Sequence, residues 1–183
     1  MEKYKELFSL KDKTAIVTGG LGILGKTFCE ALASFGSNVV VVDLNEDEIV
    51  KFVAELNSKF DSRSIGFACD ISSLEQVKKC VKFAADNYES IDILHNNAQG
   101  ATIPVPFEDC TLDDWRVTSA VNEEGYFLMA QAVGLQMIKQ KFGGSIIQTS
   151  SIYGILGPDH RIYDSVNKDG NNMGSRAVYS FSK

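Results

Sequence analysis

The sequence predicts an α/β fold built on a doubly wound parallel sheet, with helices on both faces of the sheet. Strand-like and helix-like segments alternate regularly, and single helices between strands imply right-handed parallel crossovers. The near-continuous β-branched run Val39–Val42 is typical of a strand covered on both faces. The stretch Thr14–Gly25 passes from a short apolar strand through a glycine-rich turn into a helix. In such sheets, ligands bind beyond the carboxyl ends of the strands.

The first third of the chain contains two strands and the helix between them. Ala15–Thr18 is expected to form a buried strand, and Ile23–Phe35 a helix that ends at Gly36. A second strand follows over Asn38–Leu44.

The middle of the chain repeats this pattern. Asn45 is expected to cap a helix that runs to about Phe60, and Ser64–Cys69 to form the third strand. Ser72-Ser-Leu-Glu75 has the spacing of a capping box, and therefore predicts the start of a helix that ends near Tyr88.

The last two strands lie on either side of a long helix. Ile91–His95 is expected to be the fourth strand, and Thr111 to cap a helix that runs to about Lys141. Ser145–Thr149 is the fifth strand. Residues 154–176 form an uncommonly long polar connection, which predicts a loop that acts as a lid or specificity element.

Composition limits the classes of partner. The chain of 183 residues suits one domain, and its formal net charge of -6, without a basic run, argues against nucleic acid as a partner. No apolar run is long enough for a membrane helix, so we expect a cytoplasmic protein that does not bind membranes. The four cysteines are widely spaced and form no C-x-x-C pair, which predicts reduced thiols and no metal site.

The glycine turn carries the first functional signal. Gly20-x-Gly22-x-x-Gly25 matches a dinucleotide-binding fingerprint, and the first N–H groups of the following helix favour a phosphate. Asp43 ends the second predicted strand. A carboxylate there accepts hydrogen bonds from ribose hydroxyls and repels a 2′-phosphate, so the sequence predicts NAD rather than NADP.

The segment Tyr179-x-x-x-Lys183 carries the second signal. A carbonyl that is reduced by hydride needs a proton donor, and a tyrosine phenol serves if a nearby cation stabilises its phenolate. Residues four apart on a helix share a face, so Lys183 can supply that cation.

Taken in order, these motifs resemble those of the short-chain dehydrogenase/reductase family. The resemblance covers residues 10–183. It rests on Thr18-Gly19, Asp43, Asp70, Asn96-Asn97-Ala98, Asn122, Ser150-Ser151 and Tyr179-x-x-x-Lys183.

The resemblance implies a Rossmann-type domain and an NAD-dependent oxidoreductase that transfers hydride between nicotinamide and an alcohol or carbonyl of a small substrate. The implied catalytic residues are Asn122, Ser151, Tyr179 and Lys183, with Ser150 as the rival to Ser151. The implied cofactor-binding residues are Gly19, Leu21, Gly22, Ile23, Leu24, Gly25, Asp43, Asp70, Ile71, Asn96, Asn97, Ala98, Tyr179 and Lys183. A helix-capping role explains Asp70 almost as well.

Three departures from the family pattern affect this interpretation. Ile23 occupies a position where the commoner branch has glycine, and the glycine spacing instead follows the extended branch that acts on nucleotide sugars. Gln99 replaces the glycine that usually closes the Asn-Asn-Ala-Gly motif. Tyr179 follows Ser151 at an unusually long separation, which resembles a bacterial subgroup associated with surface-polysaccharide and flagellar-sugar synthesis. A polar, sugar-like substrate is therefore expected.

The resemblance also implies further strands after Lys183, so we expect a domain over residues 1–183 that is incomplete at its C-terminal end and poorly active as written. Two alternatives remain open: a truncated, non-catalytic NAD-binding module, and a nucleotide-sugar epimerase or dehydratase of the extended branch. The full-length form is expected to be a homodimer or homotetramer, with contacts through the tyrosine helix and the helix before the fifth strand.

Overall fold

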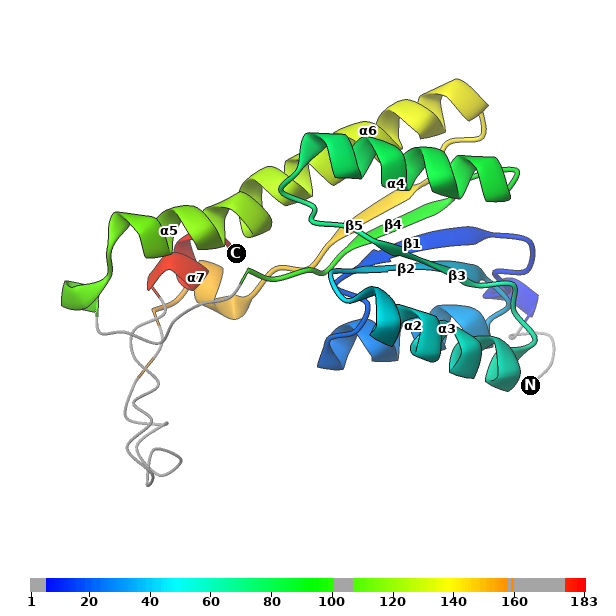
Figure 1. The fold of residues 1–183 in the computed structure, drawn as a ribbon, viewed down its shortest axis with the longest axis horizontal. Coiled ribbons are helices and arrows are strands. Elements are labelled where there is room, and N and C mark those ends of the chain that lie inside the picture. Colours follow the sequence, from blue (N-terminus) through cyan, green and yellow to red (C-terminus); the bar gives the residue numbers. More distant parts are fainter. Residues whose placement is uncertain (1–5, 101–106, 158, 160–176) are drawn as a thin grey trace. The chain divides into compact units, whose positions relative to one another are not determined.

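Five parallel strands in the order β3-β2-β1-β4-β5 form the sheet in a computed structural model of the chain (Figure 1). The structure describes residues 6–100, 107–157, 159 and 177–183. The strands are β1 (Thr14–Thr18), β2 (Asn38–Asp43), β3 (Ile65–Ala68), β4 (Ile93–Asn96) and β5 (Ser145–Gln148). The chain runs outward from β1 to β3 and then returns to β4 beside β1. This order confirms the doubly wound sheet. Strands are added on one side of β1 up to β3 and on the other side from β4 onward, while all strands stay parallel.

The chain divides into two compact units. The sheet unit comprises Met1–Ala98 and Gly125–Gln148, and the second unit comprises Gln99–Glu124 and Thr149–Lys183. A single NAD-binding domain over residues 1–183 stays a prediction. Most of the predicted insertion, residues 154–176, lies outside the described residues.

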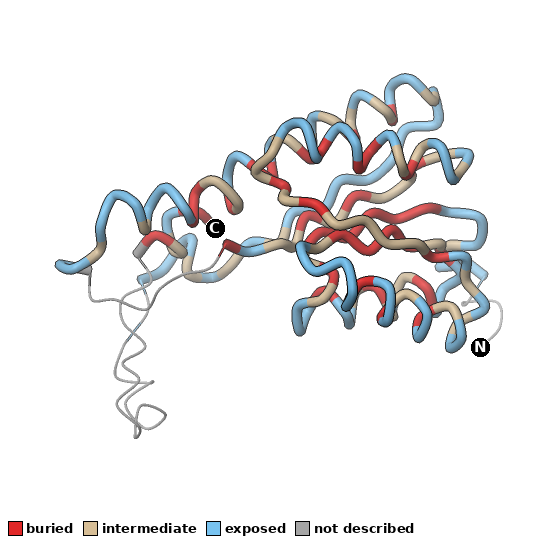
Figure 2. The backbone as a smooth tube through the Cα atoms, viewed as in Figure 1, coloured by how far each residue is buried: buried red, intermediate tan, exposed pale blue. Residues whose placement is uncertain are grey.

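In the sheet unit, helices cover both faces of the sheet (Figure 1). One face carries α2 (Ile23–Ser34) and α3 (Glu46–Phe60), and the other carries α4 (Leu74–Asn87) and α6 (Tyr126–Gln140). Figure 2 shows that the buried residues concentrate in the central strands and on the helix faces turned toward them.

The β-branched run of β2 forms the centre of this core. Val39, Val40, Val41 and Val42 are completely buried, as expected for a strand covered on both faces. β5 is the edge strand on the opposite side, and all four of its residues are exposed.

The second unit contains short elements. They are η1 (Phe107–Asp109), α5 (Leu112–Ser119), most of the π-helical turn η2 (Ala120–Gly125), η3 (Ile152–Gly154) and α7 (Ala177–Phe181). α5 contacts α7 through the rings of Trp115 and Phe181, whose centroids lie 5.5 Å apart.

Two of the predicted helix caps are confirmed and one is wrong. The Asn45 side chain caps α3, and Thr111 forms a reciprocal capping box with Asp114 at the start of α5. The cap of α4 is Ser73, whose hydroxyl accepts from the Gln76 N–H, and not Ser72. Both serines have Glu or Gln three residues later, and the Ser72 hydroxyl instead donates to Asp70.

The long helix predicted from Thr111 to Lys141 is confirmed with one irregularity. Helical structure runs from Leu112 to Gln140, but residues Ala120–Gly125 form a π-helix. π-Helical turns are rare overall, but those that occur are often found at functional sites.

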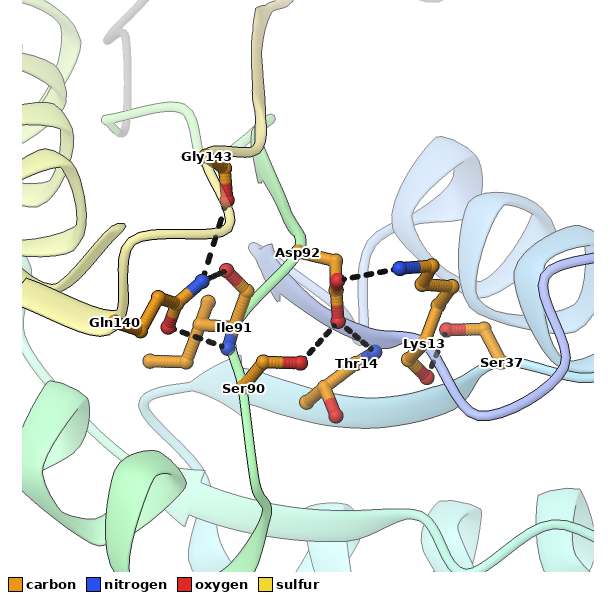
Figure 3. Close-up of polar contacts among 8 residues, drawn as sticks. All are labelled: Lys13, Thr14, Ser37, Ser90, Ile91, Asp92, Gln140 and Gly143. Carbon is orange, nitrogen blue, oxygen red and sulfur yellow. Dashed lines mark hydrogen bonds and ion pairs between the residues drawn. The ribbon is translucent and has the colours of Figure 1, made fainter. Parts of the chain in front are cut away.

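A polar cluster joins the N-terminal ends of β1 and β4 (Figure 3). The Asp92 carboxylate accepts from the Thr14 N–H (3.0 Å), the Ser90 hydroxyl (2.7 Å) and the Lys13 ammonium (2.9 Å). Burial alone would raise the pKa of Asp92, but these hydrogen bonds outweigh burial and hold the pKa below its ordinary value. The cluster therefore favours the ionised form of Asp92.

Beside this cluster, the Gln140 side chain ties the end of α6 to the chain that enters β4. Its amide donates to the Ile91 carbonyl (2.8 Å) and accepts from the Ile91 N–H (3.1 Å), and it also donates to Gly143 (Figure 3). On the other side, the Ser37 hydroxyl donates to the Lys13 carbonyl at 3.0 Å. These contacts lie at the amino ends of the strands, away from the carboxyl ends where a ligand is expected.

Within the described part of the chain, no helix is both long enough and apolar enough to cross a membrane.

Candidate functional site

The turn between β1 and α2 has no room for side chains at two of its glycines. Gly19 has a φ of +63°, and a Cβ there would lie 2.7 Å from the Ala98 Cα. A Cβ at Gly25 would lie 1.9 Å from the Gly19 carbonyl oxygen. The bare backbone of this turn therefore lies directly against the end of β4 and the first turn of α2.

The N-terminus of α2 differs from those of α3, α4 and α5. Its N-cap residue, Gly22, makes no side-chain cap, and no acidic residue lies in the first turn. In contrast, α3, α4 and α5 are each capped by a side chain and carry acids in the first turn. The uncapped N–H groups of a twelve-residue helix and the bare glycine turn fit a phosphate group. Ile23 and Leu24, the first residues of α2, are exposed.

Asp43 lies at the carboxyl end of β2, beside the same turn. Its Oδ2 accepts from the Leu21 N–H at 2.9 Å, and its Oδ1 accepts from the Leu44 N–H at 2.8 Å. Two backbone N–H groups thus fix the carboxylate next to the glycine turn.

The end of β4 is also tied to the turn. The Asn97 side-chain amide donates to the carbonyls of Thr18 and Gly19, both at 3.2 Å. The Thr18 hydroxyl accepts from the N–H groups of Asn97 (3.0 Å) and Ala98 (3.1 Å). Thr18 was not among the predicted site residues, although its place immediately before Gly19 was a signal for this bracing role.

Asn96 is completely buried. Its amide nitrogen donates to the Tyr126 carbonyl (3.0 Å) and to the Gln148 side chain (3.3 Å), while its Oδ1 has no partner among the described residues. The side chain therefore braces the ends of β4 and β5 against the start of α6.

Asp70 and Ile71 follow β3. The Asp70 Oδ1 accepts from the Ser72 N–H (2.9 Å) and the Ser72 hydroxyl (2.6 Å), which forms a local turn. Since Ser73 caps α4, the helix-cap explanation of Asp70 is wrong. Ile71 is 4% exposed and packs against Gly125, so its side chain belongs to the core.

In the second unit, Asn122 lies in the π-helical turn and is 3% exposed. Its Oδ1 accepts from the Gly100 N–H at 2.9 Å, and its Nδ2 donates to the Ser182 hydroxyl at 2.8 Å. An asparagine inside a helix is unfavourable unless its side chain has such partners.

Both serines after β5 have partners within the second unit. The Ser151 hydroxyl caps η3 by accepting from the Tyr153 N–H at 3.2 Å. The exposed Ser150 donates to the Lys183 main-chain oxygen at 2.5 Å. Ser151 as the serine that holds a substrate oxygen, with Ser150 as its rival, stays a prediction.

Tyr179 lies in α7, and Lys183 lies two residues beyond the end of that helix. Helical hydrogen bonding continues to Ser182, whose N–H donates to the Val178 carbonyl at 3.0 Å. The Lys183 ammonium donates to the Thr149 carbonyl at 3.4 Å, and burial lowers the pKa of this lysine. Tyr179 thus lies in the helix, whereas Lys183 lies just beyond the last helical hydrogen bond, so the two residues do not both belong to one regular helical face.

Two titratable groups near the glycine turn have packing roles. The His95 ring stacks on Phe28 with centroids 4.3 Å apart, and burial lowers its pKa. Burial raises the pKa of the Cys29 thiol to about 12, so this cysteine stays protonated beneath Gly20.

The predicted site residues, together with Thr18, therefore fall into two groups. The sheet unit brings together Thr18, the glycine turn, Asp43, Asn97 and Ala98 at the carboxyl ends of β1, β2 and β4. The second unit brings Asn122 to the Tyr179–Lys183 segment and Ser150 to Lys183.

The sequence matches a model of the short chain dehydrogenase family over residues 13–178. D-threitol dehydrogenase of Mycolicibacterium smegmatis is 34% identical over 163 residues, which make up 89% of this chain and 62% of that protein. NAD-dependent glycerol dehydrogenase of Listeria innocua is 34% identical over 155 residues, which make up 85% of this chain and 59% of that protein.

Solved structures show the same fold. The structure of an NAD⁺-bound xylitol dehydrogenase is 31% identical, has a TM-score of 0.79, and is matched over 95% of this chain and 60% of that chain. The chain thus spans about three fifths of the length of these relatives.

Proposed function

The chain belongs to the short chain dehydrogenase family, and from this premise we propose that it is an NAD-dependent oxidoreductase acting on a small polyol or related sugar alcohol. The observation that carries the proposal is the position of Asp43. Its carboxylate is fixed by the Leu21 N–H beside the glycine turn, at the carboxyl end of β2. A dinucleotide-binding acid is expected at this end of the second strand.

The glycine turn supports a dinucleotide as the ligand. The crowding at Gly19 and Gly25 excludes side chains, and the uncapped N-terminus of α2 leaves backbone N–H groups available to a diphosphate. This segment consists of Leu21, Gly22, Ile23 and Leu24. We propose that it holds the diphosphate, and that Asp70, Ile71, Asn96, Asn97 and Ala98 form the adenosine side of the site.

Asp43 supports NAD over NADP. A carboxylate accepts hydrogen bonds from both ribose hydroxyls of the adenosine, whereas a 2′-phosphate at the same place would meet a like charge. The relatives named above include an NAD-dependent and an NAD⁺-bound enzyme, which agrees with this choice.

We assign the proton chemistry to the second unit. The Tyr179 phenolate, stabilised by the Lys183 ammonium, takes the proton of the substrate alcohol and becomes the neutral phenol, while Ser151 holds the substrate oxygen. Asn122 holds the π-helical turn against the tyrosine segment through its hydrogen bonds to Gly100 and Ser182. Bound nicotinamide would accept the hydride from the carbinol carbon, which leaves a carbonyl.

The substrate class rests on the relatives, which are named for threitol, glycerol and xylitol. All three are small polyols, consistent with the polar substrate expected from the sequence.

The proposal is tested by following the absorbance of the reduced cofactor during incubation with D-threitol, glycerol or xylitol and either NAD or NADP. We expect slow turnover of at least one polyol with NAD, in line with the poor activity expected of the 183-residue chain, and much slower turnover with NADP. In Asp43→Ser the preference for NAD should fall by about tenfold or more, equivalent to about 1.4 kcal/mol.

Asp47→Ser is the matched control, because it removes an exposed acid from the first turn of α3 and should leave the preference unchanged. No turnover of any of the three polyols, or equal preference in Asp43→Ser and the wild type, would argue against the proposal.

A further inference from the structure

Ser182 lies inside the Tyr179-x-x-x-Lys183 segment, directly before the lysine. It is 8% exposed. Its hydroxyl accepts from the Asn122 amide at 2.8 Å and donates to the Tyr179 carbonyl at 3.2 Å. Both hydrogen-bonding functions of this buried hydroxyl are therefore used, and both lead to residues of the proposed catalytic set.

The same asparagine reaches a third segment. Its Oδ1 accepts from the Gly100 N–H, so the Asn122 side chain bridges the chain after β4 and the tyrosine segment. Because Asn122 is 3% exposed, water cannot readily replace either partner.

Gly100 is held close to α5. A Cβ at this position would lie 3.2 Å from both the Cα and the carbonyl oxygen of Thr118. The Gly100 N–H is thereby fixed against the helix that leads into the π-helical turn. Asn122 thus has one rigid partner in Gly100, and within the described part of the chain its hydrogen bond to the tyrosine segment goes to Ser182.

We infer that Ser182 is a positioning residue that fixes Tyr179 relative to Asn122 through its buried hydroxyl. This inference rests on the proposed function, because it assigns Tyr179 and Asn122 to the reaction. Loss of the hydroxyl would leave the Asn122 amide unpaired and release the Tyr179 carbonyl from one of its bonds. Tyr179 would then be held less closely in its reactive position.

Ser180 provides a matched control in the same helix. It is also adjacent to Tyr179, but its hydroxyl has no hydrogen-bond partner among the described residues. Ser180→Ala therefore makes the same chemical change beside the same tyrosine without breaking a bond.

The test compares Ser182→Ala with Ser180→Ala in the full chain. Hydrogen exchange at the Gly100 amide is measured without substrate, and kcat and KM are measured with NAD and the polyol that the wild type oxidises best. In Ser182→Ala we expect about tenfold faster exchange and about tenfold lower kcat, with an unchanged KM for NAD. Ser180→Ala should match the wild type in all three quantities.

If Ser182→Ala does not fold, Ser182→Thr and Ser182→Val decide the matter, because they have nearly the same shape and only threonine keeps a hydroxyl. Threonine should retain slow exchange at Gly100 and valine should not. The inference is overturned if removing the hydroxyl leaves the exchange of Gly100 unchanged. It is also overturned if an active wild type keeps its kcat in Ser182→Ala. A wild type without turnover would count against the proposed function, while the exchange measurement would still decide whether Ser182 holds Asn122.

Discussion

At the scale of single residues, the absence of a side chain shapes the glycine turn. Gly25 lies in the first turn of α2, where the Gly19 carbonyl oxygen would be only 1.9 Å from an added Cβ. The nearest atoms are backbone, and they cannot give way without moving the turn. A position of this kind is set by the close approach of two backbone segments.

We therefore expect Gly25→Ala to displace the turn and to destabilise the protein by about 1–3 kcal/mol, with a large loss of NADH affinity. Fluorescence titration with NADH and denaturant unfolding measure the two effects. Gly134→Ala is the control, because the nearest atom to its added Cβ is 3.9 Å away in the middle of α6. That variant should be more stable by about 0.5–1 kcal/mol and should bind NADH normally. Normal binding by Gly25→Ala would contradict the assignment of this turn to the cofactor.

At the scale of elements, Asp92 joins the starts of two neighbouring strands. Its carboxylate accepts a hydrogen bond from the buried Thr14 N–H of β1 and forms a salt bridge with the Lys13 ammonium. Asp92 itself directly precedes β4. The hydrogen bonds lower the pKa of its carboxyl in the folded protein. The folded state therefore binds a proton at this group less readily than the unfolded state does.

The stabilisation from Asp92 should consequently be present above the unfolded pKa of about 3.9 and be lost as the pH falls through the lower folded value. At neutral pH, Asp92→Asn should cost about 1 kcal/mol of unfolding free energy, and this difference should vanish in strong acid. Denaturant unfolding at a series of pH values measures it. Asp86→Asn removes an exposed pair with Lys82 and should change stability by less than about 0.5 kcal/mol. A difference between Asp92→Asn and the wild type that does not depend on pH would contradict this account.

The strands and most helices were predictable because their signals are local. The valine run of β2, the Asn45 and Thr111 caps and Gly36 each act within a few residues of the chain. Their boundaries agree with the structure to within one or two residues.

Contacts between distant segments were not predictable in the same way. Ser72 and Ser73 both fit a capping box, and only the use of Ser72 by Asp70 selects Ser73. In the π-helical turn, Asn122 accepts a hydrogen bond from the distant Gly100, and the same side chain donates to Ser182. No local pattern specifies such partners.

At the scale of the whole molecule, the proposed cofactor residues and the proposed proton-transfer residues belong to different compact units. Oxidation of an alcohol gives a hydride to the cofactor and a proton to a base, so the reaction needs the cofactor residues and the proton-transfer residues together. The expected subunit contact through α6 stays a prediction, supported by the exposed side chains of Phe127, Leu135 and Ile138 on that helix.

The central claim is that the chain transfers hydride between nicotinamide and a polyol carbon with the help of Tyr179. Its most direct test is deuterium transfer from NADH that is deuterated on the nicotinamide ring to the ketones of glycerol, D-threitol and xylitol. Mass spectrometry of the recovered polyols detects even slow transfer. The account predicts one deuterium on the carbinol carbon with the wild type, and transfer at least about a hundredfold slower in Tyr179→Phe. A wild type that binds NADH but labels none of the three polyols, or a Tyr179→Phe variant that labels them equally fast, would contradict it.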